Sequence, residues 1–307
     1  MGLVPHPGER AGGALLRHLL ANAKRPERVV VIGARGFIGR QLVSRLAADG
    51  FSSLAPPSDD LDLRDPGSAA RLAQMLRPGD AVVMLAAARH HQAGDLRTFV
   101  ENIQIGQTVC AATAAAPCAH VVYFSSDAVY PDGQEFVTEQ SCAQPTSLYG
   151  AMHLAREFMF RRSVGDRLLV ARPTLVYGPA DPHDTYGLDS MIRSALHKRR
   201  IEIFGAGEDT RDQVLVDDVV SLTLLALLHR TCGVLNLATG VSTPRLELAR
   251  VVADRFDDPV EIVRVPRRRP ASRRRFATDL CRKSFPTFQW TPLPEGVGGV
   301  VERERLS

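Results

Sequence analysis

The stretch RVVVIGARGFIG, residues 28–39, decides the fold of this 307-residue chain. It opens with a short apolar run rich in β-branched residues, which is typical of a buried strand. Glycines follow at positions 33, 36 and 39, and apolar residues then recur at helical spacing up to Gly50. A glycine turn from a strand into a helix lets the backbone approach a pyrophosphate and directs the helix N-terminus at its charge. The stretch therefore predicts a dinucleotide-binding turn, with tight strand–helix packing as the alternative use of the glycines.

Strand and helix patterns alternate beyond this turn. The expected strands cover residues 28–32, 51–56, 81–88, 120–126 and 167–173, and the expected helices cover residues 37–50, 65–78, 99–116 and 149–162. Because the strands are apolar on both faces, they indicate a parallel sheet covered by helices on both sides. We therefore expect an α/β fold with a Rossmann-like doubly wound parallel sheet and a smaller substrate-binding cap.

The regular alternation weakens in the second half of the chain. Residues 178–213 are rich in Gly, Pro, His, Asp and Arg, as expected of loops that meet a substrate. Strand and helix patterns then resume. We expect residues 1–26 to be a polar appendage with some helical character, 27–177 to be mainly the dinucleotide-binding region, and 178–307 to be mainly the cap, with some segments returning to the sheet.

Composition excludes several classes of protein. The chain has no apolar run of about 18 residues, which a transmembrane helix needs, and Arg17 and His18 interrupt the only stretch that resembles a signal peptide. Its five cysteines are scattered without metal-ligand spacing. These features predict a cytoplasmic protein without a structural metal. The basic run 264–276 is broken by proline and lacks interleaved aromatic residues, so we expect a solvated loop there and no nucleic-acid binding.

A series of motifs in the same order as in a known family makes the prediction more specific. The motifs are IGARGFIG, LDLRD, LAAA, FSSDAVYPD, YGAMH, RPTLVYGP, RDQVLVDDVV and the tail FATDLCRKSFPTFQWTPLPEGV. Over about residues 28–300 the chain resembles the extended short-chain dehydrogenase/reductase family, of the NAD-dependent epimerase/dehydratase type. Members include nucleotide-sugar epimerases, dehydratases and ketoreductases.

The resemblance implies a set of cofactor-binding residues. Asp62 takes the place of the aspartate that meets the adenine, residues 85–88 flank the nicotinamide ribose, and Arg35 could reach the 2′-phosphate of NADP. Arg35 as an exposed turn residue is the alternative, so the cofactor is NAD or NADP, with a slight preference for NADP. The full implied set is Gly33, Arg35, Gly36, Phe37, Ile38, Gly39, Asp62, Leu63, Leu85, Ala86, Ala87, Asn102, Tyr149, His153 and Pro173.

The resemblance places the reacting centre in the stretch YGAMHLARE, residues 149–157. Tyr149 matches a catalytic phenol, which needs a nearby cation to ionise near neutral pH. The family supplies a lysine four residues later, on the same helix face, but this chain has His153. A neutral imidazole can donate a hydrogen bond to the ribose but brings no positive charge. Arg156 could restore the charge; the alternatives are that it faces solvent or that a water replaces the ammonium group.

Ser126 and Asp127 match the second half of the family's site. Ser126 corresponds to a hydroxyl that bonds the reacting oxygen of the sugar, and Asp127 to a proton donor; a hydroxyl that caps a turn is the alternative for Ser126. Ala128 stands where dehydratases carry a glutamate and where the reductases that make GDP-fucose carry a cysteine. The resemblance therefore favours other epimerases and ketoreductases.

Arg211 matches the arginine that binds the diphosphate of a nucleotide sugar, for which a guanidinium is well suited. An ion pair with Asp212 or Asp217 is the alternative. His183 lies within the expected cap as a candidate acid or base, although a solvated loop histidine is the simpler interpretation.

Together these features predict an NAD(P)-dependent epimerase or ketoreductase for a nucleotide-activated sugar. The expected catalytic residues are Tyr149, Ser126, Asp127 and His153, and the expected substrate-binding residues are Ser126, Asp127 and Arg211. The alternatives are an NAD(P)-binding regulatory protein with little turnover and an oxidoreductase for a substrate without a nucleotide. We expect no nucleic-acid or membrane partner, and the helices at 99–116 and 149–162 are the candidate interface of a homodimer.

Overall fold

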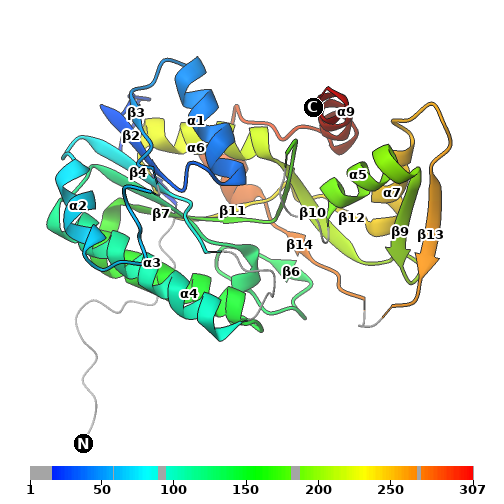
Figure 1. Cartoon of the computed structure of the whole chain (residues 1–307), viewed down its shortest axis with the longest axis horizontal. Helices are drawn as coiled ribbons and strands as arrows, with labels where there is room; N and C mark the ends of the chain where they lie inside the picture. The colour runs from blue at the N-terminus through cyan, green and yellow to red at the C-terminus, as the bar shows by residue number, and fades with distance from the viewer. Residues whose placement is uncertain (1–15, 58, 89–94, 181–186, 268–270, 307) are drawn as a thin grey trace, which may run out of the picture.

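A seven-stranded sheet forms the centre of the structure, a computed structural model that describes residues 16–57, 59–88, 95–180, 187–267 and 271–306 (Figure 1). The sheet order is β1-β11-β7-β5-β4-β2-β3. Its strands are β1 (Arg17–His18), β2 (Arg28–Ile32), β3 (Ser53–Leu54), β4 (Asp80–Met84), β5 (His120–Phe124), β7 (Leu168–Pro173) and β11 (Thr231–Leu237). β1 pairs antiparallel to β11, and all other neighbouring strands pair in parallel. The expected parallel, Rossmann-like sheet is confirmed.

Helices cover both faces of this sheet (Figure 1). One face carries α1 (Phe37–Ala48) and α6 (Val216–His229), and the other carries α2 (Ser68–Met75), α3 (Leu96–Ala115) and α4 (Leu148–Val164). Because side chains alternate along a strand, β2 contributes Val29 and Val31 to the first core and Val30 and Ile32 to the second. This two-sided burial explains why the strands are continuously apolar.

A smaller group of elements lies beside the sheet (Figure 1). Helices α5 (Leu188–Lys198), α7 (Arg245–Ala253) and α9 (Leu293–Arg305) share one core with β9 (Arg200–Phe204) and β13 (Glu261–Val265). Between the two parts lie the sheet of β12 (Ser242–Pro244), β10 (Thr210–Leu215) and β8 (Leu175–Tyr177), and the pair β14 (Arg275–Phe276) and β6 (Phe136–Val137). The short helix α8 (Asp279–Ser284) packs beside β11, and its Cys281 joins the first core of the large sheet. Since α6 and β11 return to the large sheet, the second half of the chain is shared between both parts.

Two local features differ from the sequence pattern. The strand expected over residues 51–56 is shorter and covers only β3, Ser53–Leu54. Pro56 and Pro57 follow it and lack the N–H groups that a strand ladder needs. Residues 16–26 show no helix. Instead β1 pairs with β11, and the backbone N–H groups of Leu19 and Lys24 donate to carbonyls of Arg230 and Leu228, at 3.2 and 2.9 Å. This part of the expected appendage is therefore attached to the sheet.

The order of the strands determines where a ligand can bind. From β2 the chain passes to β3 on one side and then returns to β4 on the other. In open α/β sheets, ligands bind beyond the carboxyl ends of the strands at such a switch point. The glycine turn follows β2 and residues 85–88 follow β4, so both expected cofactor segments lie at this point.

Side-chain caps fix the starts of two helices near the switch point. Asp95 directly precedes α3, and its carboxylate accepts a hydrogen bond from the Arg97 N–H in the first turn. The Ser147 hydroxyl likewise accepts from the Gly150 N–H at 3.1 Å, at the start of α4. Such caps stabilise a helix by about 1 kcal/mol, and the second one defines the position of Tyr149 in the first turn of α4.

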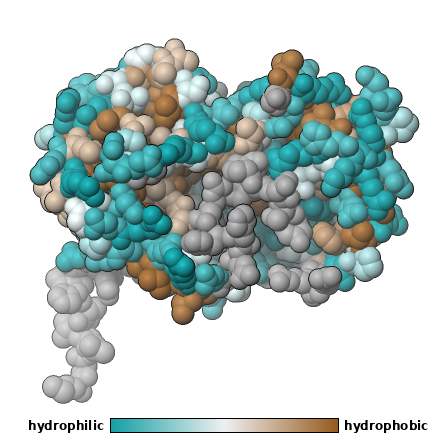
Figure 2. Space-filling view, viewed as in Figure 1, coloured by the Kyte–Doolittle hydropathy of each residue, from teal (hydrophilic) through white to brown (hydrophobic). Residues whose placement is uncertain are grey.

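The surface is largely hydrophilic on the face in Figure 2, where hydrophobic side chains lie in small separate groups. Within the ranges that the structure describes, no helix combines the length and apolar character needed to cross a bilayer.

Gly39 provides a test of the tight packing of the glycine turn. A Cβ there would overlap the Gly33 carbonyl oxygen and lie 2.9 Å from the Ala34 Cα. We expect Gly39→Ala to lower the free energy of unfolding by about 1–3 kcal/mol, as overpacking usually does. Gly299→Ala in α9 is the control, because its new Cβ would meet nothing within 4 Å. There the gain in helix propensity should raise the free energy of unfolding by about 0.5–1 kcal/mol. Urea unfolding measures both variants, and equal stability of the two would contradict the packing argument.

Candidate functional site

The glycine turn and the loop after β4 approach each other closely. Gly33 has a φ of +96°, and a Cβ on it would lie 2.6 Å from the Ala86 nitrogen, so only glycine fits. The Leu85 N–H donates to the Ile32 carbonyl at 2.8 Å. Among the described residues, no side chain caps the N-terminus of α1, and its first turn contains no acid. The positive end of the helix is thus available for a phosphate.

Asn102 holds the loop on the opposite side. Its side-chain amide donates to the carbonyls of Ala88 and Thr98, at 3.0 and 2.9 Å, and its oxygen accepts from the Ala88 N–H at 3.0 Å. Asn102 is buried. The asparagine therefore fixes the shape of residues 85–88 from inside α3.

Charged residues form the outer edge of this region. Arg35 pairs with Asp59 at 3.0 Å, and both side chains are exposed. Asp62 accepts from Arg64 through both carboxylate oxygens, at 2.9 and 2.8 Å. These hydrogen bonds lower the pKa of Asp62. Other expected cofactor residues come from three segments around the large sheet: Phe37 and Ile38 begin α1, Leu63 packs on the core beneath α2, and Pro173 ends β7.

Helix α4 brings Tyr149 and His153 together. Their rings meet edge to face, with centroids 4.7 Å apart. His153 is buried, and its Nδ1 lies 2.8 Å from the Tyr123 hydroxyl. Burial, together with the charge of Arg156, lowers the pKa of His153 to about 3, so the imidazole is neutral. Its Nε2 has no partner among the described residues and is buried.

Tyr149 is open on one side, with 51% of the residue exposed. The protein packed around its other side nevertheless raises the pKa of the phenol, because burial disfavours the charged form. The neighbouring Ser126 hydroxyl and the charge of Arg156 lower this pKa, while Asp127 raises it further. Ser126 also accepts from the Ala128 N–H at 3.1 Å. The structure thus places the expected phenol and hydroxyl next to each other.

Asp127 has a partner that the sequence does not predict. Arg274, which is only 3% exposed, lies 3.3 Å from the Asp127 carboxylate and also donates to the Asp127 and Pro131 carbonyls. Burial raises the pKa of Asp127, whereas Arg274 and Arg211 lower it. Arg274 belongs to the basic run expected to be a solvated loop, so that expectation is wrong at this residue. No local signal distinguishes it from the neighbouring arginines.

Arg211 does not form the ion pairs that were its alternative explanation. Asp212 accepts from the N–H groups of Thr239 and Gly240, and Asp217 pairs with Arg303 at 3.0 Å. Arg211 donates instead to the Ser272 hydroxyl at 2.8 Å. Burial and the nearby charge of Arg274 lower the pKa of Arg211. Two guanidinium groups that repel each other form a region suited to an anion.

A buried network beneath the site was also missed. The Glu157 carboxylate accepts from Arg172 at 2.8 and 2.6 Å and from the Ser125 hydroxyl at 2.6 Å. Arg172 also donates to the Tyr130 hydroxyl at 2.8 Å. This network joins α4 to the carboxyl ends of β5 and β7, directly before Ser126.

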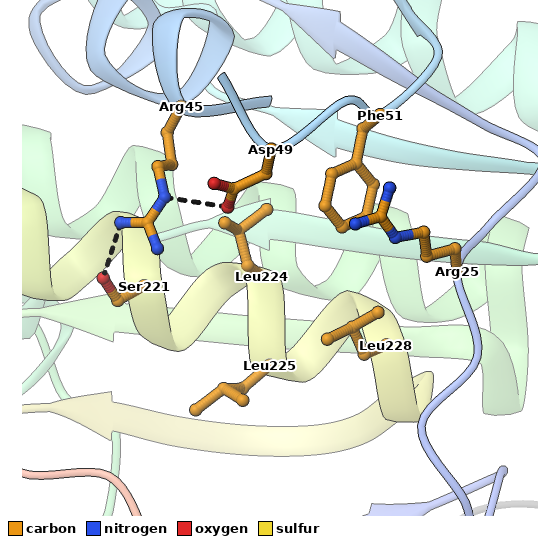
Figure 3. Close-up of a pocket in the computed structure, with 8 residues that line it drawn as sticks. All are labelled: Arg25, Arg45, Asp49, Phe51, Ser221, Leu224, Leu225 and Leu228. Atoms are coloured by element: carbon orange, nitrogen blue, oxygen red, sulfur yellow. Dashed lines mark hydrogen bonds and ion pairs between the residues drawn. The ribbon is translucent and has the colours of Figure 1, made fainter. Parts of the chain in front are cut away.

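One cavity in the described part of the chain adjoins these residues. A cavity of about 570 Å³ lies between β10, β12 and β14, and it is lined by Glu135, Ala206, Gly207, Glu208, Thr210, Ser242, Pro244, Leu246, Arg273, Arg274 and Arg275. Arg274 connects it to Asp127. A second cavity, of about 410 Å³, lies over α6, where Arg45 pairs with Asp49 and Arg25 stacks on Phe51 (Figure 3). It contains none of the expected site residues.

Some expectations lie outside what the structure describes. His183 and residues 268–270 of the basic run are outside the described residues. Across the described part of the chain, no three His, Cys, Asp or Glu side chains group as metal ligands, and the five cysteines form no disulfide.

Comparison with known proteins assigns the family. The sequence model of the NAD dependent epimerase/dehydratase family matches residues 29–238. The UDP-glucose 4-epimerase of Mycolicibacterium smegmatis is 31% identical over an alignment of 309 residues, gaps included. The match covers 90% of this chain and 97% of that protein. MoeE5 in complex with UDP-glucose and NAD has a TM-score of 0.77 and 27% identity, covering 91% of this chain and 100% of its own. RMD from Pseudomonas aeruginosa complexed with NADPH has a TM-score of 0.79 and 26% identity, and the match covers 92% of this chain and 100% of that protein's chain.

The buried, neutral His153 predicts that the protein loses stability in mild acid. A histidine in the unfolded chain has a pKa near 6.5, whereas the pKa in the folded state is about 3. The stabilisation is complete above pH 6.5 and is lost as the pH falls towards 3, because the unfolded state binds the proton first. We expect the free energy of unfolding to fall by about 1–2 kcal/mol from this residue between pH 6.5 and 5. In urea unfolding, His153→Gln should flatten the pH dependence and the exposed His197→Gln should not; parallel profiles for both would contradict the assignment.

Proposed function

The chain belongs to the NAD dependent epimerase/dehydratase family, and we propose that it is an NAD(P)-dependent epimerase or ketoreductase for a nucleotide-activated sugar. The observation that carries the proposal is the position of Tyr149 beside Ser126, at the carboxyl ends of the strands where the glycine turn also lies. A phenol and a hydroxyl at that point can share one oxygen of a substrate.

The dinucleotide would lie across the switch point. The close approach of Gly33 to Ala86 and the uncapped N-terminus of α1 fit a pyrophosphate. For the adenine ribose, Asp59 could accept from the 2′-hydroxyl of NAD and Arg35 could donate to the 2′-phosphate of NADP. Related structures hold NAD or NADPH. The slight preference for NADP rests on Arg35 alone.

The residues around Tyr149 suit proton transfer to and from an oxygen. Bound nicotinamide would supply the hydride donor or acceptor. Tyr149 would take the proton from a sugar hydroxyl during oxidation and return it to the carbonyl oxygen during reduction. Ser126 would bond the same oxygen, and Asp127, held by Arg274, would act as a further proton donor. Ala128 offers neither acid nor base, which favours epimerisation or ketone reduction over dehydration.

Arg211 and Arg274 support a substrate that contains a diphosphate. Both lie close enough to Asp127 to lower the pKa of its carboxyl, and Arg274 lines the 570 Å³ cavity. A guanidinium can donate two parallel hydrogen bonds to phosphate oxygens. The UDP-sugar named for one related structure is of this class.

The rival proposal is a dinucleotide-binding protein with little turnover. It is favoured by the inward position of His153, which is bonded to Tyr123 instead of facing a ribose. A substrate without a nucleotide is the third possibility, and binding to sugar nucleotides separates it from the first.

We also propose a homodimer across α3 and α4. These helices carry exposed hydrophobic side chains at Leu96, Val100 and Phe158, with 65%, 57% and 60% of each residue exposed. Burial of such side chains against a second copy would stabilise the dimer by about 25 cal/mol per Å² of apolar surface.

Tyr149→Phe tests the proposed acid/base. The variant keeps the ring and loses the hydroxyl, so we expect turnover of a sugar nucleotide to fall by about 100-fold or more. Stabilisation of the fold by NAD or NADP should remain, since most proposed contacts to the dinucleotide lie elsewhere. Thermal unfolding with each ligand and a nicotinamide absorbance assay measure the two effects. Tyr177→Phe, in the core of the smaller part, is the matched control. Full turnover by Tyr149→Phe would exclude the proposed role.

Arg211→Met tests the substrate class. Loss of a charged hydrogen-bond donor usually costs about 1.5–3 kcal/mol, which corresponds to about 10–100-fold weaker binding of a UDP-sugar. Binding of the dinucleotide should not change, and calorimetric titration measures both constants. The exposed Arg200→Met is the control. A variant that binds UDP-sugars as tightly as the parent protein would remove Arg211 from the substrate site.

A further inference from the structure

Arg156 is a buried cation directly beneath the candidate site. It lies seven residues after Tyr149 on α4, and none of its surface is exposed. One guanidinium nitrogen donates to the Ala86 carbonyl at 2.9 Å, and another lies 3.5 Å from the Asn102 side-chain oxygen. The guanidinium carbon lies 5.1 Å from the centre of the Tyr123 ring. All these partners are neutral.

No carboxylate neutralises this charge within the described part of the chain. The nearest acid in sequence, Glu157, is bonded to Arg172 and Arg161, and the Arg156 Nε has no hydrogen-bond acceptor among the described residues. A buried charge without a counter-ion costs several kcal/mol. An apolar side chain of similar volume would avoid this cost, so the charge itself calls for an explanation.

The fold makes room for the arginine. Gly106 on α3 faces it, and a Cβ there would lie 3.0 Å from the Arg156 Cγ and 3.2 Å from its Nε. The side chain therefore passes between α3 and α4 and ends at the loop that adjoins the glycine turn. Its position is determined at both ends, by Gly106 and by Ala86.

The charged and titratable groups around Tyr149 identify what this cation can act on. Asp127 and Tyr123 bring no positive charge, and His153 is neutral because burial and Arg156 both lower its pKa. Arg274 is paired with Asp127, and Arg211 donates to the Ser272 hydroxyl. Arg156 is thus the cation on α4 whose charge favours the Tyr149 phenolate.

We infer that Arg156 is a positioning residue of the reacting centre, which stabilises the Tyr149 phenolate from inside the protein and fixes the loop at Ala86. The inference rests on the proposed function, in which Tyr149 is the acid/base. The neutral His153 cannot supply a positive charge, and the inference assigns that charge to Arg156, three residues further along the helix.

Titration of Tyr149 in the protein without ligands tests the inference. The five tyrosines are labelled with ¹³C at Cζ, and Tyr149→Phe identifies the signal by NMR. Arg156→Met should raise the pKa of Tyr149 by about one unit, because the neutral side chain no longer favours the phenolate. Arg156→Gln is a second neutral variant in case the first does not fold, and Arg156→Lys should restore most of the shift. Arg162→Met, an exposed arginine of the same helix, should leave the pKa unchanged.

The outcomes separate this inference from the proposed function. A pKa of Tyr149 that is the same in both neutral variants as in the parent protein would overturn the inference, whatever the activity. A raised pKa in a protein that neither a dinucleotide nor a sugar nucleotide stabilises would support the electrostatic role and reject the proposed function. If the enzyme turns over a sugar nucleotide, the pH profile of kcat should move up by the same amount in Arg156→Met, with KM nearly unchanged.

Discussion

The buried ion pair of Glu157 and Arg172 is the interaction on which the site depends. Arg172 donates to both carboxylate oxygens at 2.8 and 2.6 Å, and neither residue reaches solvent to any extent. Ser125, directly after β5, donates to the same carboxylate. Helix α4 is thereby held against the carboxyl ends of two neighbouring strands. Removal of Glu157 would leave the Arg172 charge buried without its carboxylate, which costs about 3–5 kcal/mol. Removal of Arg172 would leave Glu157 with only the partly exposed Arg161 as its ion-pair partner. The position of Tyr149 relative to Ser126 follows from this attachment.

The same ion pair explains the state of the neighbouring arginine. Successive residues of a helix project about 100° apart, so Glu157 meets β7 while Arg156 meets α3. Since Glu157 is already bonded to Arg172, its charge is balanced there and leaves Arg156 without a counter-ion among the described residues. One turn of α4 thus contains two buried charges. Glu157 is paired with Arg172 and fixes the helix, whereas Arg156, beneath the Tyr149 phenol, has no counter-ion among the described residues and lowers the stability of the fold.

Sequence reasoning succeeded where the signal is local. The glycine turn, the alternation of strands and helices, and the contact of Tyr149 with His153 all follow from periodicity over a few residues. It could not find Arg274, whose partner Asp127 is 147 residues away in the chain, because pairing over that distance leaves no periodic pattern. The direction of Arg156 was open for a different reason. Position i+7 lies on nearly the same helix face as Tyr149, and Tyr149 is half exposed, so the spacing alone does not say whether the arginine faces solvent. The space beside Gly106 lets the side chain turn inward.

The replacement of a lysine by His153 separates two tasks that one ammonium group could perform together. The positive charge can come from Arg156, but the hydrogen bond to a ribose cannot, because that guanidinium is buried under the loop. In His153, Nδ1 is already bonded to the Tyr123 hydroxyl at 2.8 Å, so only Nε2 is left for a ribose. Nε2 is buried and has no partner among the described residues, so a ribose hydroxyl would have to reach it inside the protein. A dinucleotide would therefore be held mainly at its pyrophosphate, by the glycine turn, and more weakly at the nicotinamide end. The site then retains the means to ionise Tyr149 while its hold on the reacting ring depends on the loop that Asn102 and Arg156 fix.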